Sequence, residues 1–280
     1  MPELPEVETV RVALESKLVG ARLSDVRIHR ADLRRPFPQD FARQLDGEIV
    51  RNVARRAKYL LIYLTGGDVW VTHLGMTGIF DVHARLDTPP PAKPKHLHFQ
   101  CIARKGAQAW TVDFYDRRRF GFMLLVPQGE LADADWYREL GVEPLSEGFN
   151  ADYLLRLTAN RKRSLKTLLM EQEAVAGLGN IYSGEALWRG RLNPSRGANT
   201  LTRTEANALV KGIKRVLHDA IDAGVASLGT DGELGRDGYF AHAYKVYDRE
   251  GLPCPRRDGG RIEKIAENGR SSFFCPRCQK

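Results

Sequence analysis

The sequence predicts an α+β protein in several parts: an N-terminal helix with a β-sandwich or barrel, a helical second half, and a cysteine-bearing hairpin at the end. Apolar side chains three and four residues apart mark one face of a helix from about residue 5 to 19, which Gly20 stops. Short segments rich in β-branched and aromatic residues follow at close spacing, which is typical of a sandwich or barrel. These segments are 49–53, 59–64, 69–72, 97–102, 109–115 and 121–126.

The apolar spacing becomes helical beyond about residue 130. Leucines between positions 154 and 169 begin this region, and Thr202 with Glu205 forms a capping box that opens a further helix with apolar residues as far as Ile221. The polar segment 128–150, which contains glycine and proline, predicts the boundary between the halves. The proline-rich segment 88–94 predicts an exposed loop.

Composition narrows the class of protein. The chain has 280 residues, enough for one large domain or two ordinary ones. Lys and Arg number 43 against 35 Asp and Glu, a net charge of +8, which favours polyanionic partners, although a basic solvated surface alone would explain the same balance. No basic N-terminal segment precedes an apolar run, and no stretch of about 18 apolar residues occurs, so we expect a cytoplasmic protein without export or a membrane span.

Three of the four cysteines lie near the C-terminus, as Cys254 and the pair Cys275 and Cys278. Zinc takes about four ligands in a tetrahedron, and two Cys-x-x-Cys turns on a hairpin supply them. Arg257 stands where the first turn would carry its second cysteine, so the pattern predicts a degenerate zinc ribbon, with Asp258 or water as fourth ligand, or a hairpin that holds without metal. The other interpretation is a free or redox-active cysteine pair with Cys254 incidental.

The N-terminus carries a second candidate for chemistry. Removal of Met1 would leave Pro2 as a secondary amine, and an α-amino group has a pKa near 8, so a usable fraction is neutral and nucleophilic at pH 7. Such an amine condenses with an aldehyde carbon to an iminium, an electron sink suited to elimination on a sugar, and Glu3 beside it could move protons. Alternatively, Glu3, Glu6 and Glu8 only complement the positive end of the first helix.

Five segments together resemble bacterial formamidopyrimidine-DNA glycosylase, of the Fpg/Nei family. The resemblance extends from Pro2 to the terminal Cys-x-x-Cys-Gln-Lys, and the order of the segments makes it highly specific. They are Met-Pro-Glu-Leu-Pro-Glu-Val-Glu-Thr at 1–9, Arg-Ala-Lys-Tyr-Leu at 56–60, His-Leu-Gly-Met-Thr-Gly at 73–78, Asp-Arg-Arg-Arg-Phe-Gly at 116–121 and Gly-Leu-Gly-Asn-Ile-Tyr at 177–182.

The resemblance implies an α+β multidomain fold, with an N-terminal β-sandwich that carries the catalytic proline, then a helix-two-turn-helix bundle and a C-terminal zinc-ribbon-like β-hairpin. It implies one zinc ion per chain, held by Cys254, Cys275 and Cys278. The expected parts are a catalytic sandwich at 1–130, a linker at 131–149, a helix-two-turn-helix DNA-binding domain at 150–225, a mobile lesion loop at 226–240 and the hairpin at 241–280.

The resemblance also implies catalytic roles for three residues. Pro2 attacks the anomeric carbon of the sugar, Glu3 donates the proton that helps to open the sugar ring, and Lys58 contacts a phosphate near the lesion and assists catalysis. Without the resemblance, Lys58 would read as a solvated lysine at a strand edge.

Further residues match DNA contacts of the family. Met76, Arg118 and Phe120 match the set that fills the gap left by an extruded nucleotide, in which Phe120 wedges the stack and Arg118 reads the orphaned cytosine. Taken singly, Met76 and Phe120 would more often be core residues. The remaining implied DNA contacts are His73, Asn180 and Arg270.

Asn180 and Arg270 are expected to hold phosphate. Asn180 caps a helix start, where backbone N–H groups form an anion site, and Arg270 lies at the hairpin tip. A simple turn between two helices is the alternative for the glycine-rich segment before Asn180. The glycine- and aspartate-rich segment 229–238 reads as a mobile loop that, by resemblance, covers the extruded base.

We therefore expect a bifunctional DNA glycosylase and abasic-site lyase of base excision repair. It would excise oxidised purines (8-oxoguanine and formamidopyrimidines) from duplex DNA through a Schiff base at the N-terminal proline, with β,δ-elimination. One alternative is an endonuclease VIII-like glycosylase for oxidised pyrimidines, against which Leu4 and the gap-filling set argue. Another is a non-catalytic lesion-binding module, against which the three catalytic residues argue. We expect a nucleoid-associated bacterial monomer whose partner is duplex DNA with oxidised bases or abasic sites.

Overall fold

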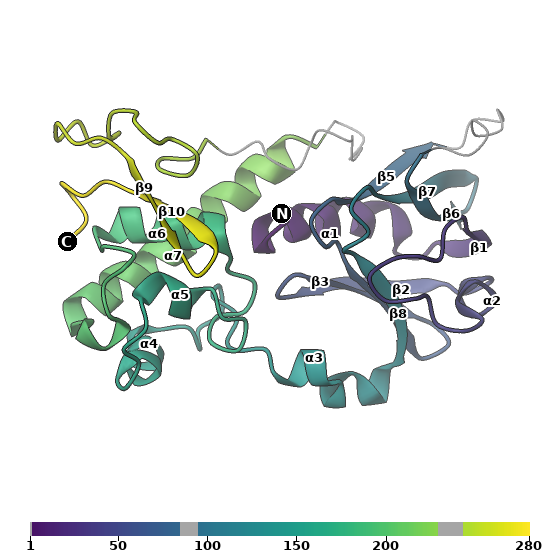
Figure 1. Ribbon diagram of the computed structural model, residues 1–280. Helices are drawn as coiled ribbons and strands as arrows, with labels where there is room; N and C mark the ends of the chain where they lie inside the picture. Colours follow the sequence, from purple (N-terminus) through teal and green to yellow (C-terminus); the bar gives the residue numbers. More distant parts are fainter. Residues whose placement is uncertain (1, 85–94, 229–242) are drawn as a thin grey trace. The chain divides into compact units, whose positions relative to one another are not determined.

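The computed structural model describes residues 2–84, 95–228 and 243–280 (Figure 1). The chain forms two compact units, which we call the sandwich unit (Met1–Arg138 with Ile221–Ala241) and the helical unit (Glu139–Ala220 with His242–Lys280). Met1 and the proline-rich loop expected at 88–94 lie outside the described residues. So do residues 229–240 of the lesion loop expected at 226–240.

The first helix, α1 (Leu4–Leu18), forms where the apolar spacing predicts it. Its apolar face is buried, and Gly20 follows the helix with φ +84°, a left-handed conformation that glycine adopts at little cost. Glu3 and Glu6 form a capping box at the start of the helix, in which the Glu3 backbone N–H donates to Glu6 Oε2 at 2.8 Å. The N-terminus of the protein is therefore held by a well-capped, buried helix.

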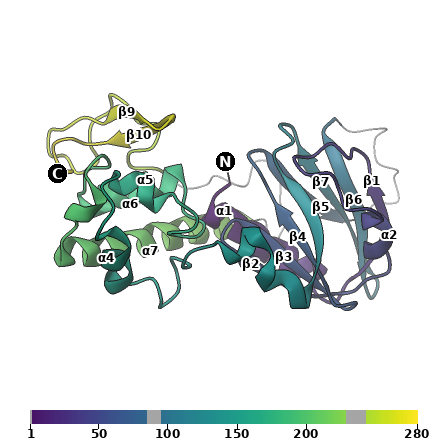
Figure 2. The ribbon, with the colours of Figure 1, turned by 60° about the horizontal axis from the view of Figure 1, so that its bottom comes forward.

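Two antiparallel four-stranded sheets form the sandwich predicted for the first half, together with the short helix α2 (Phe41–Leu45). Figure 2 shows α1 alongside β2 and β3, against which it packs. One sheet has the order β1 (Arg22–Ile28), β6 (Leu97–Lys105), β7 (Gln108–Asp116) and β5 (Gly78–Ala84). The other has the order β2 (Val50–Arg56), β3 (Tyr59–Leu64), β4 (Asp68–His73) and β8 (Phe122–Pro127).

Aromatic side chains from both sheets meet in the core of the sandwich. The ring of Trp70, on β4, lies 4.9 Å from that of Phe99 on β6 and 6.2 Å from that of Phe80 on β5. All three side chains are fully buried, together with the apolar face of α1. The helix α1 is therefore anchored in the core of the sandwich.

The outer face of the second sheet is covered by residues from the segment expected to be a linker. The 3-10 helix η1 (Gln128–Asp133) and the short helix α3 (Asp135–Arg138) follow β8 directly. Leu131 and Trp136 pack there against Val69 and Val71 of β4 and against Tyr59 of β3. These residues therefore belong to the sandwich unit.

The helical unit contains the helices and the hairpin predicted for the second half. Thr202 and Glu205 form the expected capping box, since the Thr202 N–H donates to Glu205 Oε2 at 2.9 Å and the Glu205 N–H donates to Thr202 Oγ1 at 3.3 Å. None of the described helices combines the length and apolar character of a membrane span. The elements are α4 (Ala151–Thr158), α5 (Leu165–Leu169), α6 (Asn180–Gly190), η2 (Ala198–Thr200), α7 (Arg203–Ala226, which ends in the sandwich unit), β9 (Glu263–Glu267) and β10 (Arg270–Phe274).

Candidate functional site

Pro2 and Glu3 are buried at the start of α1. Glu3 is 1% exposed and occupies the N-cap position, so the capping box with Glu6 fixes the backbone that directly follows Pro2. Glu3 and Glu6 thus do complement the helix start, as one interpretation of the sequence proposed. This role leaves the candidate nucleophile on a rigid element, which is what precise attack on a substrate atom requires.

Lys58 lies in the tight turn between β2 and β3 and is 8% exposed. The turn has an unusual backbone, because Ala57 has φ +52°. Arg55 supports it from two sides: its Nη1 donates to the Ala57 carbonyl at 2.9 Å, and its Nε donates to Glu8 Oε2 of α1 at 2.9 Å. One guanidinium therefore joins the turn that carries Lys58 to the helix that follows Pro2.

His73, at the end of β4, is held as a neutral ring. Burial, followed by the nearby positive charges of Lys58 and Arg34, lowers the pKa of His73 to about 4. The ring stacks on Phe122 with centroids 5.4 Å apart, and its Nδ1 accepts the Gly75 N–H at 3.0 Å. The neutral ring therefore carries its proton on Nε2, which leaves that N–H as a donor for an anion.

The predicted gap-filling residues lie on two neighbouring loops, between β4 and β5 and between β7 and β8. Phe120 is 41% exposed, which contradicts the interpretation of this residue as part of the core, and the Arg118 guanidinium lies 4.8 Å from the centre of its ring. Met76 is half-buried. The loops approach so closely that a Cβ at Gly75 would lie 2.3 Å from the Gly121 nitrogen.

Asp116 organises these two loops, and the sequence analysis did not single it out. Its carboxylate is fully buried and accepts the Thr77 hydroxyl at 2.5 Å, the Arg118 N–H at 3.2 Å and the Gly121 N–H at 2.7 Å. The available signal was its place at the head of the Asp-Arg-Arg-Arg-Phe-Gly motif. An acid next to three arginines, however, suggests an ion pair with one of them rather than hydrogen bonds that join two loops.

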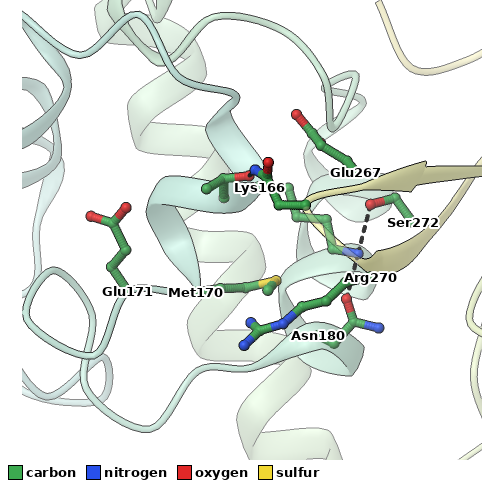
Figure 3. Close-up of a pocket in the computed structure, with 9 residues that line it drawn as sticks. Lys166, Met170, Glu171, Asn180, Glu267, Arg270 and Ser272 are labelled. Atoms are coloured by element: carbon green, nitrogen blue, oxygen red, sulfur yellow. Dashed lines mark hydrogen bonds between the residues drawn. The ribbon is translucent and has the colours of Figure 1, made fainter.

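A pocket of about 350 Å³ in the helical unit brings Asn180 and Arg270 together (Figure 3). Lys166 of α5 is 3% exposed and ties three elements together at this pocket. Its Nζ donates to Asn180 Oδ1 at 2.8 Å, to Ser272 Oγ at 2.9 Å and to the Ser271 carbonyl at 3.1 Å. The glycine-rich segment before α6 is thus more than a turn, because it delivers Asn180 to a lined pocket.

Lys166 was missed by sequence reasoning. It sits between Leu165, Leu168 and Leu169, and a lysine beside an apolar helix face is normally expected to reach solvent. A buried ammonium needs acceptors on several sides, and here two side chains and a backbone carbonyl supply them. The pocket that Asn180 and Arg270 line is therefore also lined by a buried lysine whose hydrogen bonds are satisfied.

The predicted metal ligands Cys254, Cys275 and Cys278 lie together, with Asp258 as a fourth group, and the ligand atoms lie within 4.8 Å of one another. Cys254 is therefore not incidental. Arg257, expected at the missing ligand position, is exposed and outside the cluster; its φ of +56° turns the chain so that the next residue, Asp258, faces the sulfur atoms. Three sulfur atoms and a carboxylate form a donor set that suits zinc.

The chain matches curated relatives along its whole length. It is 46% identical over 292 residues to the formamidopyrimidine-DNA glycosylase of Caulobacter vibrioides strain NA1000, and 45% identical over 296 residues to that of Rhodopseudomonas palustris strain TIE-1, with 100% of both chains covered in each case. The chain belongs to the formamidopyrimidine-DNA glycosylase family. Family membership makes it a DNA glycosylase of base excision repair.

Family models match each part of the chain. Residues 1–123 match the N-terminal domain of formamidopyrimidine-DNA glycosylase, 140–231 match its H2TH domain, and 251–280 match the zinc finger found in FPG and IleRS. The expected sandwich, helix-two-turn-helix part and zinc-ribbon-like hairpin are therefore confirmed, and the metal cluster falls inside the zinc-finger match.

Solved structures agree with this assignment. The complex between the Lactococcus lactis Fpg and an abasic site containing DNA has a TM-score of 0.86 and 31% identity over 99% of both chains. The wild-type Lactococcus lactis Fpg with DNA containing N7-benzyl-Fapy-dG gives the same TM-score and identity over 100% of both chains. The family, fold and zinc-finger type predicted from the sequence are thus confirmed together.

Proposed function

We propose that the protein excises oxidised purines, namely 8-oxoguanine and formamidopyrimidines, from duplex DNA and then cleaves the abasic strand through a Schiff base at Pro2. The buried, capped start of α1 supports the role of Pro2, because it holds the amine next to Glu3. The solved relatives whose DNA contains an abasic site or a modified Fapy-dG support this class of substrate.

The chemistry follows from a neutral secondary amine beside a carboxyl group. The Pro2 nitrogen attacks C1′ of the nucleotide, and the glycosidic bond breaks as the base leaves with the bonding electrons and takes up the proton that the Pro2 nitrogen loses. Glu3 gives a proton to the ring oxygen, which opens the sugar, and the electron pair on nitrogen then forms the iminium. The iminium acidifies the neighbouring C2′, so that first the 3′ and then the 5′ phosphate is lost by elimination.

Charged and neutral donors around this centre would hold the DNA backbone. Lys58 supplies a positive charge near the reacting sugar, and His73 supplies a neutral Nε2–H. In the helical unit, Asn180, Arg270 and the N–H groups at the start of α6 form a second phosphate grip above Lys166. Phosphate contacts of this kind position the duplex without reading its sequence.

The gap left by the extruded nucleotide would be filled by Met76, Arg118 and Phe120. The exposure of Phe120 suits a side chain that enters a base stack, and the guanidinium of Arg118 beside it offers donors to the orphaned cytosine. Since the curated relatives are DNA glycosylases of bacteria, we place the protein in the bacterial cytoplasm, associated with the nucleoid.

The capped Pro2–Glu3 start of α1 is the observation that carries the proposal, and borohydride trapping tests it. Reduction in the presence of duplex DNA with a single 8-oxoguanine opposite cytosine should give one covalent adduct, which peptide mass spectrometry places on Pro2. An adduct on a lysine would overturn the Pro2 assignment. Faster excision of thymine glycol than of 8-oxoguanine would instead favour the endonuclease VIII-like alternative.

A further inference from the structure

We propose that Asp258 is a ligand of the zinc ion, so that this chain binds the metal through three thiolates and one carboxylate. This inference concerns the metal centre alone and does not depend on the lesion or on the role of Pro2. It turns an apparently damaged site, with Arg257 in place of a cysteine, into a complete one with a different fourth donor.

The spacing of the donor atoms matches a tetrahedral shell. With Zn–S bonds of about 2.3 Å and a Zn–O bond of about 2.1 Å, tetrahedral geometry separates two sulfurs by about 3.8 Å and a sulfur from an oxygen by about 3.6 Å. Cys254 Sγ and Cys278 Sγ are 3.9 Å apart, and Asp258 Oδ2 is 3.7 Å from Cys275 Sγ. The carboxylate oxygen is thus one tetrahedron edge away from the Cys275 sulfur, which is the separation that a shared zinc ion would require.

The backbone around Asp258 is built to aim its carboxylate. The Arg257 N–H closes a turn onto the Cys254 carbonyl at 2.9 Å, and the Cys254 N–H bonds to the Gly260 carbonyl at 2.9 Å. The Gly260 N–H donates to Asp258 Oδ1 at 2.8 Å, which orients the carboxylate with Oδ2 at 3.7 Å and Oδ1 at 3.9 Å from Cys275 Sγ. Such support from outside the ligand shell is usual for carboxylate ligands.

Gly260 also leaves the space that the donors need. A Cβ at this position would lie 2.5 Å from Cys275 Sγ and 3.0 Å from Asp258 Oδ1, closer than real Cβ atoms come to a sulfur. A glycine is therefore required where the two halves of the donor set face each other. The space beside Gly260 is occupied by donors of the set that contains Asp258, and Arg257 lies outside this set.

Charge is conserved by the replacement. Four thiolates around Zn²⁺ carry a net charge of −2, and three thiolates with one carboxylate carry the same charge. A water molecule in the fourth position would leave −1. The Arg277 side chain, packed against Gly259, lies next to this anionic shell. The carboxylate thus preserves the electrostatics for which the hairpin is built.

The site closes the small core that holds the hairpin. Cys254 and Cys275 pack with Trp188, Ile262 and Phe273 in one apolar cluster. Arg256, two residues after Cys254, stacks on Trp188 at 4.4 Å and donates to its carbonyl at 2.9 Å. Metal binding at this point therefore secures the strand that carries Arg270 against α6.

Zinc K-edge X-ray absorption on the full-length protein tests the proposal directly. The wild type should contain one equivalent of zinc with three sulfurs and one oxygen, and Asp258→Cys should give four sulfurs. In the cobalt-substituted protein, the thiolate-to-cobalt absorption should rise by about a third from wild type to Asp258→Cys, in proportion to the number of thiolates.

Affinity for the metal gives a second readout. Competition with a chromogenic chelator should show zinc held at least about tenfold more weakly by Asp258→Ala than by wild type. Arg257→Ala is the matched control, because it changes the exposed neighbour in the same turn, and it should bind zinc as wild type does. If Asp258→Ala does not fold, Asp258→Cys still decides the question.

Several results would overturn the proposal. A sulfur count of three in both wild type and Asp258→Cys would place residue 258 away from the metal. Equal zinc affinity in Asp258→Ala and wild type would assign the fourth position to water. A wild-type protein that takes up no zinc from a stoichiometric solution would show that the four donors hold the hairpin through hydrogen bonds alone.

Discussion

The proposed catalytic start of α1 and the hairpin β9–β10 are held by opposite means. Pro2 and Glu3 stand on a helix whose apolar face enters the main core of the sandwich, so many contacts share the task of holding them. Arg270 stands on a two-stranded hairpin with a small core, which depends on four metal donors and on the single ammonium of Lys166. The proposed catalytic residues thus stand on the more extensively packed element, and the proposed phosphate-binding Arg270 stands on an element that a single substitution could loosen.

Blocking the amine of Pro2 is expected to have the largest effect and to separate the two regions. A protein that retains Met1, or that carries an acetylated Pro2 nitrogen, cannot form the iminium, and base excision and borohydride trapping should fall by at least about a thousandfold. Binding to duplex DNA with a stable abasic-site analogue should stay within about threefold, because no phosphate contact is changed. Trapping at the wild-type rate with the terminus blocked would refute the assignment.

Replacement of Lys166 should do the reverse. Lys166→Ala leaves Asn180, Ser271 and Ser272 without their shared donor, a loss of about 2 kcal/mol that should weaken duplex binding roughly 30-fold. The rate of trapping at saturating DNA should change little. Lys162→Ala, which removes an exposed lysine from the same segment, is the control for loss of charge alone. Equal weakening by both variants would mean that Lys166 acts only through its charge.

The stability of the sandwich unit should depend on pH through His73. Its folded pKa of about 4 lies below the unfolded value of 6.5, so below pH 6.5 the unfolded chain binds a proton that the folded chain does not. The free energy of unfolding should therefore fall as the pH drops from 6.5 toward 4, by at most about 1.4 kcal/mol per pH unit from this group.

His73→Gln removes this contribution, because glutamine does not titrate. Urea unfolding followed by tryptophan fluorescence between pH 4.5 and 7 should give a shallower pH dependence for the variant than for wild type. Parallel curves would show that the ring is protonated in the folded protein, and would remove the argument that its Nε2–H acts as a neutral donor.

The smallest expected effect tests the bridge from α1 to the turn that carries Lys58. Arg55→Lys keeps the charge beside Glu8, but it cannot bond to Glu8 and the Ala57 carbonyl in the same forked geometry. The trapping rate at saturating DNA should fall about tenfold, while duplex affinity and the sulfur count at zinc stay unchanged. Arg51→Lys, on the same strand and exposed, is the matched control. A loss of affinity without a loss of rate would give Arg55 a DNA-binding role instead.

Much of the architecture could be predicted because buried residues of helices and strands recur at regular spacings in the sequence. The apolar spacing of α1, the capping box of α7 and six of the eight sandwich strands were read from local pattern alone. β1 was not predicted, because its pairing with β6 shifts register between Ser24 and Arg27 and Asp25 has φ +54°, which breaks the alternation of apolar and polar residues.

The sequence by itself determined most of the elements and the family to which the chain belongs. It did not determine the partners of single polar side chains. Asp258 rather than Arg257 faces the sulfurs because one residue adopts a positive φ, and Lys166 is buried because acceptors from α6 and β10 surround it. The spacing of apolar residues indicates whether a position is buried. The hydrogen-bond partners of a buried polar group depend on turn dihedrals and on contacts between distant segments, and these are present only in the tertiary structure.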